Sequence, residues 1–173
     1  MTPDVVPFLL PAETAPKLEV CIMGVDPGLS GAVAFYFPRH PHLIAAEDMP
    51  AVAGEVDVAT LAQRVRQMAP TVAIVERVGA MPKQGVASTF RFGVSYGAVR
   101  GVIAAAGVPM HLVTPGRWKK HFRLPADKEA ARALALRLWP TSEHFARKKD
   151  HGRAEAALIA RWAAEILPGA RDG

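Results

Sequence analysis

Cysteine is almost absent from this chain of 173 residues, in which Cys21 is the single example. One cysteine excludes an intrachain disulfide and a zinc site built from four thiolates. Long apolar runs are also absent, since glycine and proline interrupt the longest uncharged stretch, residues 101–116, and make it unsuitable as a membrane span. No basic segment precedes the apolar residues 8–10, so we expect no secretory signal and a protein of the reducing cytoplasm.

Acidic residues are missing between Glu76 and Asp127. The same segment contains eight basic residues: Arg77, Lys83, Arg91, Arg100, Arg117, Lys119, Lys120 and Arg123. Residues 1–76 carry 4 Lys and Arg against 9 Asp and Glu, whereas residues 77–173 carry 17 against 7. This cationic second half favours a polyanionic partner, although basic side chains can equally serve only to solvate helices.

The apolar pattern predicts one mixed α/β domain over residues 19–168, preceded by a proline-rich tail or wrapping arm over residues 1–18. Apolar runs predict strands over residues 19–26, 31–37, 42–48, 71–76 and 108–114. Helical spacing predicts a helix over residues 57–68 with Asp57 as its cap, a loop over residues 78–84, a long helix after Gln84 to about residue 106, and a mostly helical remainder. Short connections between the first three strands predict an antiparallel meander.

Two carboxylates, Asp26 and Glu76, end the two most apolar predicted strands. The carboxyl ends of neighbouring strands are where α/β proteins form their sites, and a buried carboxylate needs a compensating partner there. Both residues are therefore candidate ligands of a cation. The structural alternatives are an Asx turn for Asp26 and an ion pair with Arg77 or Lys83 for Glu76.

The last predicted helix adds His151 and Glu155, which lie four residues apart and therefore share one face. Neighbouring alanines keep this helix slim enough to approach a sheet. At 3.6 residues per turn, His151 lies about 40° from Glu155 around the helix, whereas Asp150 lies about 140° away. The structural alternatives are a helix-capping Asp150 and a Glu155 that pairs with Arg153 or Arg161.

Aromatic side chains at helical spacing are usually part of a core. This rule predicts a core role for Phe90, Phe92, Tyr96 and Val99, with a dimer interface or a strand-opening wedge as alternatives. It also predicts that Trp118 and Trp139 anchor the packing.

Three motifs together resemble the RuvC-like Holliday junction resolvases, especially phage-type members of the RNase H-like superfamily. They are GVDPGLSGA at residues 24–32, IVE at 74–76 and DHGRAEA at 150–156, and the sequence VTPGRWKK at 113–120, followed by Asp127-Lys128-Glu129, is similar to the family's basic segment. The resemblance spans about residues 19–165. It implies an RNase H-like, five-stranded mixed sheet, three antiparallel strands and then parallel strands, flanked by helices, with Asp26 and Glu76 side by side.

The resemblance also implies an activity: a Mg²⁺-dependent endodeoxyribonuclease that resolves four-way DNA junctions by paired nicks, leaving 5′-phosphate and 3′-hydroxyl ends. Two Mg²⁺ ions per site, replaceable by Mn²⁺, would be held by Asp26, Glu76 and Glu155 with His151 or Asp150. The side chains expected on DNA phosphates are Arg77, Lys83, Arg91, Arg117, Lys119, Lys120, Lys128, Lys148, Lys149 and Arg153. Paired nicks imply a homodimer, packed through the helix after Gln84, and the implied location is the cytoplasm of a bacterial or phage-infected host cell, without a membrane partner.

The chain departs from the family pattern at four positions. Glu155 stands where the family has Asp, and Gly152 stands where the family has the preceding ligand. Gly79 and Met81 stand where the family tends to place an aromatic wedge. Two other functions use the same features: an RNase H-like nuclease acting on RNA or RNA/DNA hybrids, and a junction-binding protein that has lost catalysis.

Overall fold

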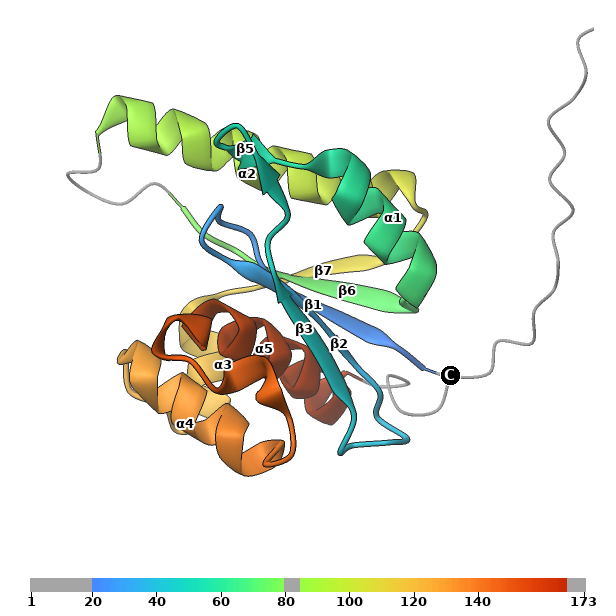
Figure 1. Ribbon diagram of the computed structural model, residues 1–173, viewed down its shortest axis with the longest axis vertical. Coiled ribbons are helices and arrows are strands. Elements are labelled where there is room, and N and C mark those ends of the chain that lie inside the picture. The colour runs from blue at the N-terminus through green and yellow to red at the C-terminus, as the bar shows by residue number, and fades with distance from the viewer. Residues whose placement is uncertain (1–19, 80–84, 168–173) are drawn as a thin grey trace, which may run out of the picture.

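The computed structural model describes residues 20–79 and 85–167. The predicted tail, Lys83 and Met81 therefore lie outside the described residues. A five-stranded sheet separates two layers of helices (Figure 1). The helices α1 (Val58–Met68) and α2 (Val86–Ala105) cover one face, and α3 (Pro115–His121), α4 (Lys128–Leu138) and α5 (His151–Ile166) lie on the other.

The sheet has the order β3-β2-β1-β6-β7. Its strands are β1 (Ile22–Asp26), β2 (Ala32–Tyr36), β3 (Ile44–Asp48), β6 (Val72–Glu76) and β7 (Met110–Val113). The first three pair antiparallel, and β1, β6 and β7 pair parallel. The predicted mixed sheet is confirmed, and its parallel half brings the ends of β1 and β6 to one edge.

Short elements account for most of the differences from the predicted pattern. A two-residue turn joins β4 (Ala51–Val52) to β5 (Glu55–Val56) in a short hairpin, and its residues Ala53 and Gly54 have positive φ angles of 51° and 80°. The sequence did not predict this turn, because alanine rarely adopts the left-handed region. Two 3₁₀ turns, η1 (Glu143–Phe145) and η2 (Lys148–Asp150), lead into α5.

The core has one layer on each face of the sheet. Met23 and Val25 pack under α1 and α2, whereas Ile22 packs against α5. Trp118 and Trp139 are fully buried, which confirms their predicted role as packing anchors.

The predicted core face of α2 is only partly correct. Val99 is fully buried, and Phe92 stacks on Tyr96, which packs against the core. Phe90, however, is 70% exposed, so its predicted core role is wrong. The helix is apolar on several sides, and spacing alone does not show which side meets the sheet. None of the described helices is long and apolar enough to cross a membrane.

Two glycines bring α5 and the turn after β1 close to the sheet. A Cβ atom on Gly24 would lie 2.0 Å from the carbonyl oxygen of Ala156, so α5 rests directly on the backbone of β1. A Cβ atom on Gly31 would lie 2.2 Å from the carbonyl oxygen of Asp26, which leaves room only for glycine. The fully buried Ala157 and Ala160 complete the slim face of α5. This close approach carries Glu155 toward the strand ends.

Candidate metal-binding active site

Glu76 ends β6 with its side chain largely buried. Its Oε1 atom accepts a hydrogen bond of 2.8 Å from the indole Nε1–H of Trp118. Burial raises the pKa of Glu76 to about 7, and the charges of Asp26 and Glu155 add to this rise against the lowering effect of the indole bond. Glu76 thus bonds an indole of α3 and not Arg77, one of the two ion-pair partners in the structural alternative, whose side chain is exposed; the other, Lys83, lies outside the described residues.

Asp26 ends β1, one strand away from Glu76 in the sheet. Burial raises the pKa of Asp26 to about 6, and the negative charge of Glu155 contributes in the same direction. The backbone N–H of Gly28 donates to the Asp26 carboxylate, so the predicted turn interaction is present as well. Asp26 therefore caps its turn and also belongs to a group of three interacting carboxylates.

Glu155 is the third carboxylate, and α5 supplies it. The Nζ atom of Lys119 lies 2.8 Å from its Oε1 atom, in an ion pair where the two side chains are 19% and 9% exposed. That buried oxygen has no partner that meets hydrogen-bond geometry. The predicted alternatives for Glu155 are wrong, because Arg153 pairs with Asp48 and Arg161 pairs with Glu165.

The three carboxylates have the chemistry of a site for a hard divalent cation. Two of them have raised pKa values because burial and mutual repulsion disfavour their charges, and the third has a buried oxygen without a hydrogen bond. Within residues 20–79 and 85–167, no three His, Cys, Asp or Glu side chains lie close enough together to form a preassembled metal site. The donor set fits a metal ion, and the Lys119 ammonium supplies positive charge at the same place.

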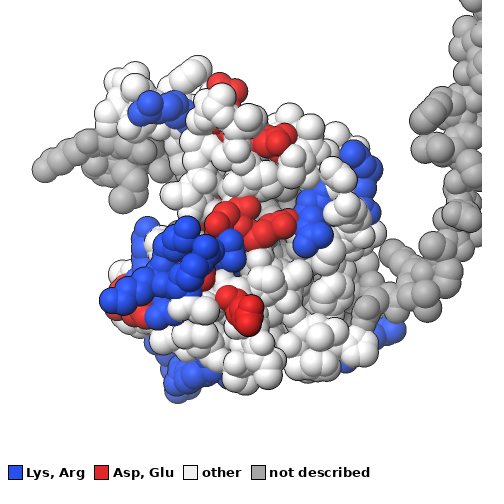
Figure 2. Space-filling model, viewed as in Figure 1, with Lys and Arg blue, Asp and Glu red and all other residues white. Residues whose placement is uncertain are grey.

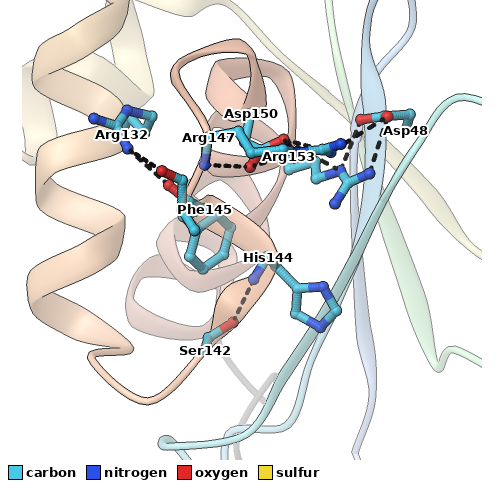
Figure 3. A network of polar contacts seen from close by, with 9 residues as sticks. Asp48, Arg132, Ser142, His144, Phe145, Arg147, Asp150 and Arg153 are labelled. Carbon is cyan, nitrogen blue, oxygen red and sulfur yellow. Dashed lines mark hydrogen bonds and ion pairs between the residues drawn. The ribbon is translucent and has the colours of Figure 1, made fainter.

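Asp150 lies in a different network, at the beginning of α5 (Figure 3). Its carboxylate is fully buried and accepts hydrogen bonds of 2.8 Å from the backbone N–H and 2.9 Å from Nε of Arg147. Burial opposes ionisation of Asp150, but the bonds from Arg147 hold its pKa below the usual range. The side chain does not cap α5, as one structural alternative proposed, and instead fixes the η2 turn.

His151 lies at the first turn of α5 and is partly buried. With Ser30, Gly31 and Asp48 it lines a small cavity of about 300 Å³. The structure therefore places His151 on the same helix as Glu155 but beside the turn that follows β1.

Substitution of Asp150 is expected to lower stability rather than catalysis. Asp150→Asn keeps one oxygen for Arg147 but removes the charge, which we expect to cost on the order of 2 kcal/mol in the free energy of unfolding. Urea denaturation measures this loss, and nuclease activity per folded molecule is expected to persist. If Asp150→Asn abolishes cleavage without loss of stability, Asp150 is a ligand after all. His151→Ala, assayed in parallel, tests the remaining candidate.

The predicted DNA-binding residues fall into three groups. Lys119 and Arg153 form ion pairs with Glu155 and Asp48, the second through two hydrogen bonds of 2.7 and 2.9 Å, so these pairs would have to open before either side chain binds phosphate. The exposed members are Arg77, Arg91, Arg117, Lys120, Lys128, Lys148 and Lys149. Lys83 lies outside the described residues. Figure 2 shows Lys and Arg side chains gathered beside acidic side chains on one face of the molecule.

Sequence reasoning missed two contributors to the site, Trp118 and the inward role of Lys119. Trp118 was expected only to pack, yet its N–H bonds the Glu76 carboxylate. The available sequence signal was that Trp118 and Lys119 are neighbours in the basic segment that follows the predicted strand over residues 108–114. The contacts themselves join residues 42 and 36 positions apart, which no local pattern contains.

Comparisons with known proteins agree with this architecture. No family model matches the chain. A stretch of 72 residues, 40% of this chain, is 39% identical to the chloroplastic Holliday junction resolvase MOC1 of Chlamydomonas reinhardtii, but spans only 8% of that protein. The structure of Thermus thermophilus RuvC in complex with a Holliday junction substrate matches with a TM-score of 0.59 and 17% identity, over 85% of this chain and 96% of that one. A second Thermus thermophilus RuvC structure gives 0.59 and 16% over the same shares. The chain therefore has the RuvC-like fold that its motifs predict.

Proposed function

We propose that this protein is a metal-dependent endodeoxyribonuclease that resolves four-way DNA junctions. The observation that carries the proposal is the electrostatic coupling of Asp26, Glu76 and Glu155 at the edge of the sheet, which together with burial raises the pKa values of Asp26 and Glu76. Such carboxylates disfavour their own ionisation unless a cation joins them. The fold shared with RuvC and the short match to a resolvase support the substrate class.

In this proposal Asp26, Glu76 and Glu155 hold Mg²⁺, with Mn²⁺ as a substitute, and His151 is the candidate fourth ligand. The bound ions would supply an activated water and stabilise the leaving 3′ oxygen, which yields a 5′ phosphate. The indole of Trp118 fixes the orientation of Glu76 through its 2.8 Å bond. Lys119 balances the negative charge of the carboxylates when no ion is present.

A cleavage assay on matched substrates tests the proposal. Four-way, forked and linear DNA and an RNA/DNA hybrid of the same sequence are incubated with Mg²⁺, with Mn²⁺ or with a chelator. We expect paired nicks in the four-way junction that depend on metal ions and leave 5′-phosphate ends. Preferential cleavage of the hybrid would instead indicate an RNase H-like activity, and binding without cleavage would indicate a junction-binding protein.

Exposed lysines near the site are expected to contact DNA phosphates. Lys128 is close enough to the site to lower the pKa of Asp26, and Lys120 follows the ion-paired Lys119 on α3. Replacing Lys120 and Lys128 together by alanine is expected to reduce the slope of log affinity against log salt by about two units, at about 0.9 per phosphate contact. Arg137→Ala, on the exposed side of α4, is the control. An unchanged slope in the double variant would place the DNA elsewhere.

We propose that the protein acts as a homodimer packed through α2. Val86, Phe90 and Val94 are 87%, 70% and 42% exposed, and they lie on one side of this 20-residue helix. The same side carries Gly93, Gly97 and Gly101, and a Cβ atom on any of them would meet open space. Glycine costs about 1 kcal/mol relative to alanine within a helix. The monomer gains no close packing from these glycines, whereas a second helix would.

Gly97→Leu is expected to convert the dimer into a monomer, because the added side chain prevents close approach of the two helices. The helix itself gains propensity, so thermal stability of the monomer should not fall. Analytical ultracentrifugation over a range of concentrations measures the change. Ser88→Leu, on a different exposed side of α2, serves as the control. A Gly97→Leu dimer of unchanged affinity would move the interface away from this face.

A further inference from the structure

An apolar groove lies between α1 and α2, on the opposite side of the sheet from α5. Its volume is about 690 Å³. The apolar lining includes Val58, Ala62 and Val65 of α1 and Val102, Ala105 and Val108 at the end of α2 and beyond it. Val58 is 46% exposed in the described part of the chain, so an apolar side of α1 is left open. Arg66 is the one charged side chain in this lining.

The described chain enters the fold beside this groove. The carbonyl oxygen of Cys21 accepts hydrogen bonds of 2.8 Å from the backbone N–H and 3.0 Å from the hydroxyl of Thr71. The residue before Thr71 is Pro70, which lines the groove. Residues 1–19, which precede the described part, therefore join it next to one end of the groove.

The sequence of this N-terminal segment complements the groove. Residues 5–10 read Val-Val-Pro-Phe-Leu-Leu and contain no charge, while Asp4 and Glu13 flank them with the sign opposite to that of Arg66. The prolines at positions 3, 7, 11 and 16 restrict the free segment, which reduces the entropy lost on docking. Nine residues separate Leu10 from Val20, and these ten steps along the chain span up to about 33 Å, about twice the length of α1 at about 1.5 Å per residue.

We propose that residues 5–10 of this same chain dock in the groove between α1 and α2. The apolar side chains of the segment cover Val58 and Ala62, and the short tether makes docking intramolecular, which favours it over binding of a separate molecule. This inference does not depend on the nuclease proposal, since the groove and the three carboxylates lie on opposite sides of the sheet.

Photo-crosslinking of the full chain tests the docking. Phe8 is replaced by p-benzoylphenylalanine, the protein is irradiated, and the cross-linked peptides are identified by mass spectrometry. We expect cross-links to residues 58–69 or 102–108. Leu9→Ser combined with Leu10→Ser, which leaves the folded domain untouched, should lower their yield by about tenfold or more, because it removes the apolar surface that docking buries.

A matched pair of variants tests the groove itself. Ala62→Asp places a charge in the groove and should reduce the cross-links, whereas Ala133→Asp, on an exposed side of α4, should not. Mixing isotope-labelled and unlabelled chains separates the possible sources of a cross-link. Cross-links between labelled and unlabelled chains would overturn the proposal in favour of docking by a second copy. If residue 8 forms no cross-link to either α1 or α2, the proposal is overturned altogether.

Discussion

Asp26→Asn is expected to abolish DNA cleavage, with a loss of about a thousandfold or more, while junction binding persists. The substitution removes one of the three carboxylates that would hold the metal ion but none of the exposed basic side chains. In the absence of metal ions the variant should also be more stable than the wild type, because it lacks a charge whose burial raises its pKa to about 6. Loss of activity together with a gain in stability is the signature of a ligand rather than a structural residue.

The matched control for this experiment is Asp57→Asn. Asp57 caps α1 through a 3.1 Å bond to the backbone of Thr60, and asparagine is an equally good cap, so cleavage and stability should both stay close to those of the wild type. Cleavage is measured as the initial rate on a four-way junction, and binding as affinity with Ca²⁺ or no metal ion. An Asp26→Asn variant that turns over at the wild-type rate would remove Asp26 from the site.

The metal-free protein is expected to become more stable as the pH falls from about 8 to about 5.5. The pKa values of Asp26 and Glu76 in the folded protein, about 6 and about 7, lie above those of an unfolded chain. The folded state therefore binds more protons in this window, and the stability contributed by these groups is lost as the pH rises through 6 to 7. At about 1.4 kcal/mol per pKa unit, the full difference reaches about 3 kcal/mol for each group near pH 4, and the window down to pH 5.5 contains part of it, most of it from Glu76.

Differential scanning calorimetry at each pH, with and without Mg²⁺, measures this dependence. Burial lowers the pKa of His144, which acts in the opposite direction within the same window. The double variant Asp26→Asn with Glu76→Gln keeps His144, so the difference between wild type and variant isolates the two carboxylates. Mg²⁺ should stabilise the wild type more at the higher pH, where the carboxylates are ionised. A wild type and a variant with the same pH dependence would contradict the raised pKa values.

The sequence predicted the parts of the site that depend on local pattern. Asp26 and Glu76 are candidates because each ends an uninterrupted apolar run, and Glu155 is a candidate because helical spacing and small neighbours allow it to approach the sheet. The bond from Trp118 to Glu76 and the pair between Arg153 and Asp48 were not predictable, since tertiary packing brings together residues 42 and 105 positions apart.

The same limit explains the errors in α2 and at the start of α5. Phe90 shares its helical spacing with true core residues, and only the position of the sheet decides which side of the helix is covered. One structural alternative for Asp150 was a cap of α5, but the preceding 3₁₀ turn brings Arg147 to its carboxylate instead. Turns of this kind leave no periodic signal in a sequence.

Gly24 gives the proposed site a property that none of its ligands determines. Because Gly24 has no side chain, α5 rests directly on the backbone of β1. The carboxylate of Glu155 is therefore held closer to those of Asp26 and Glu76 than any larger residue at position 24 would allow. Mg²⁺ demands short and regular bonds to oxygen, whereas Ca²⁺ accepts longer ones. Gly24 would then determine the preference of the site for a small ion without contacting the metal or the DNA. A change in the spacing between α5 and β1 would therefore be the first way to alter which ion the site prefers.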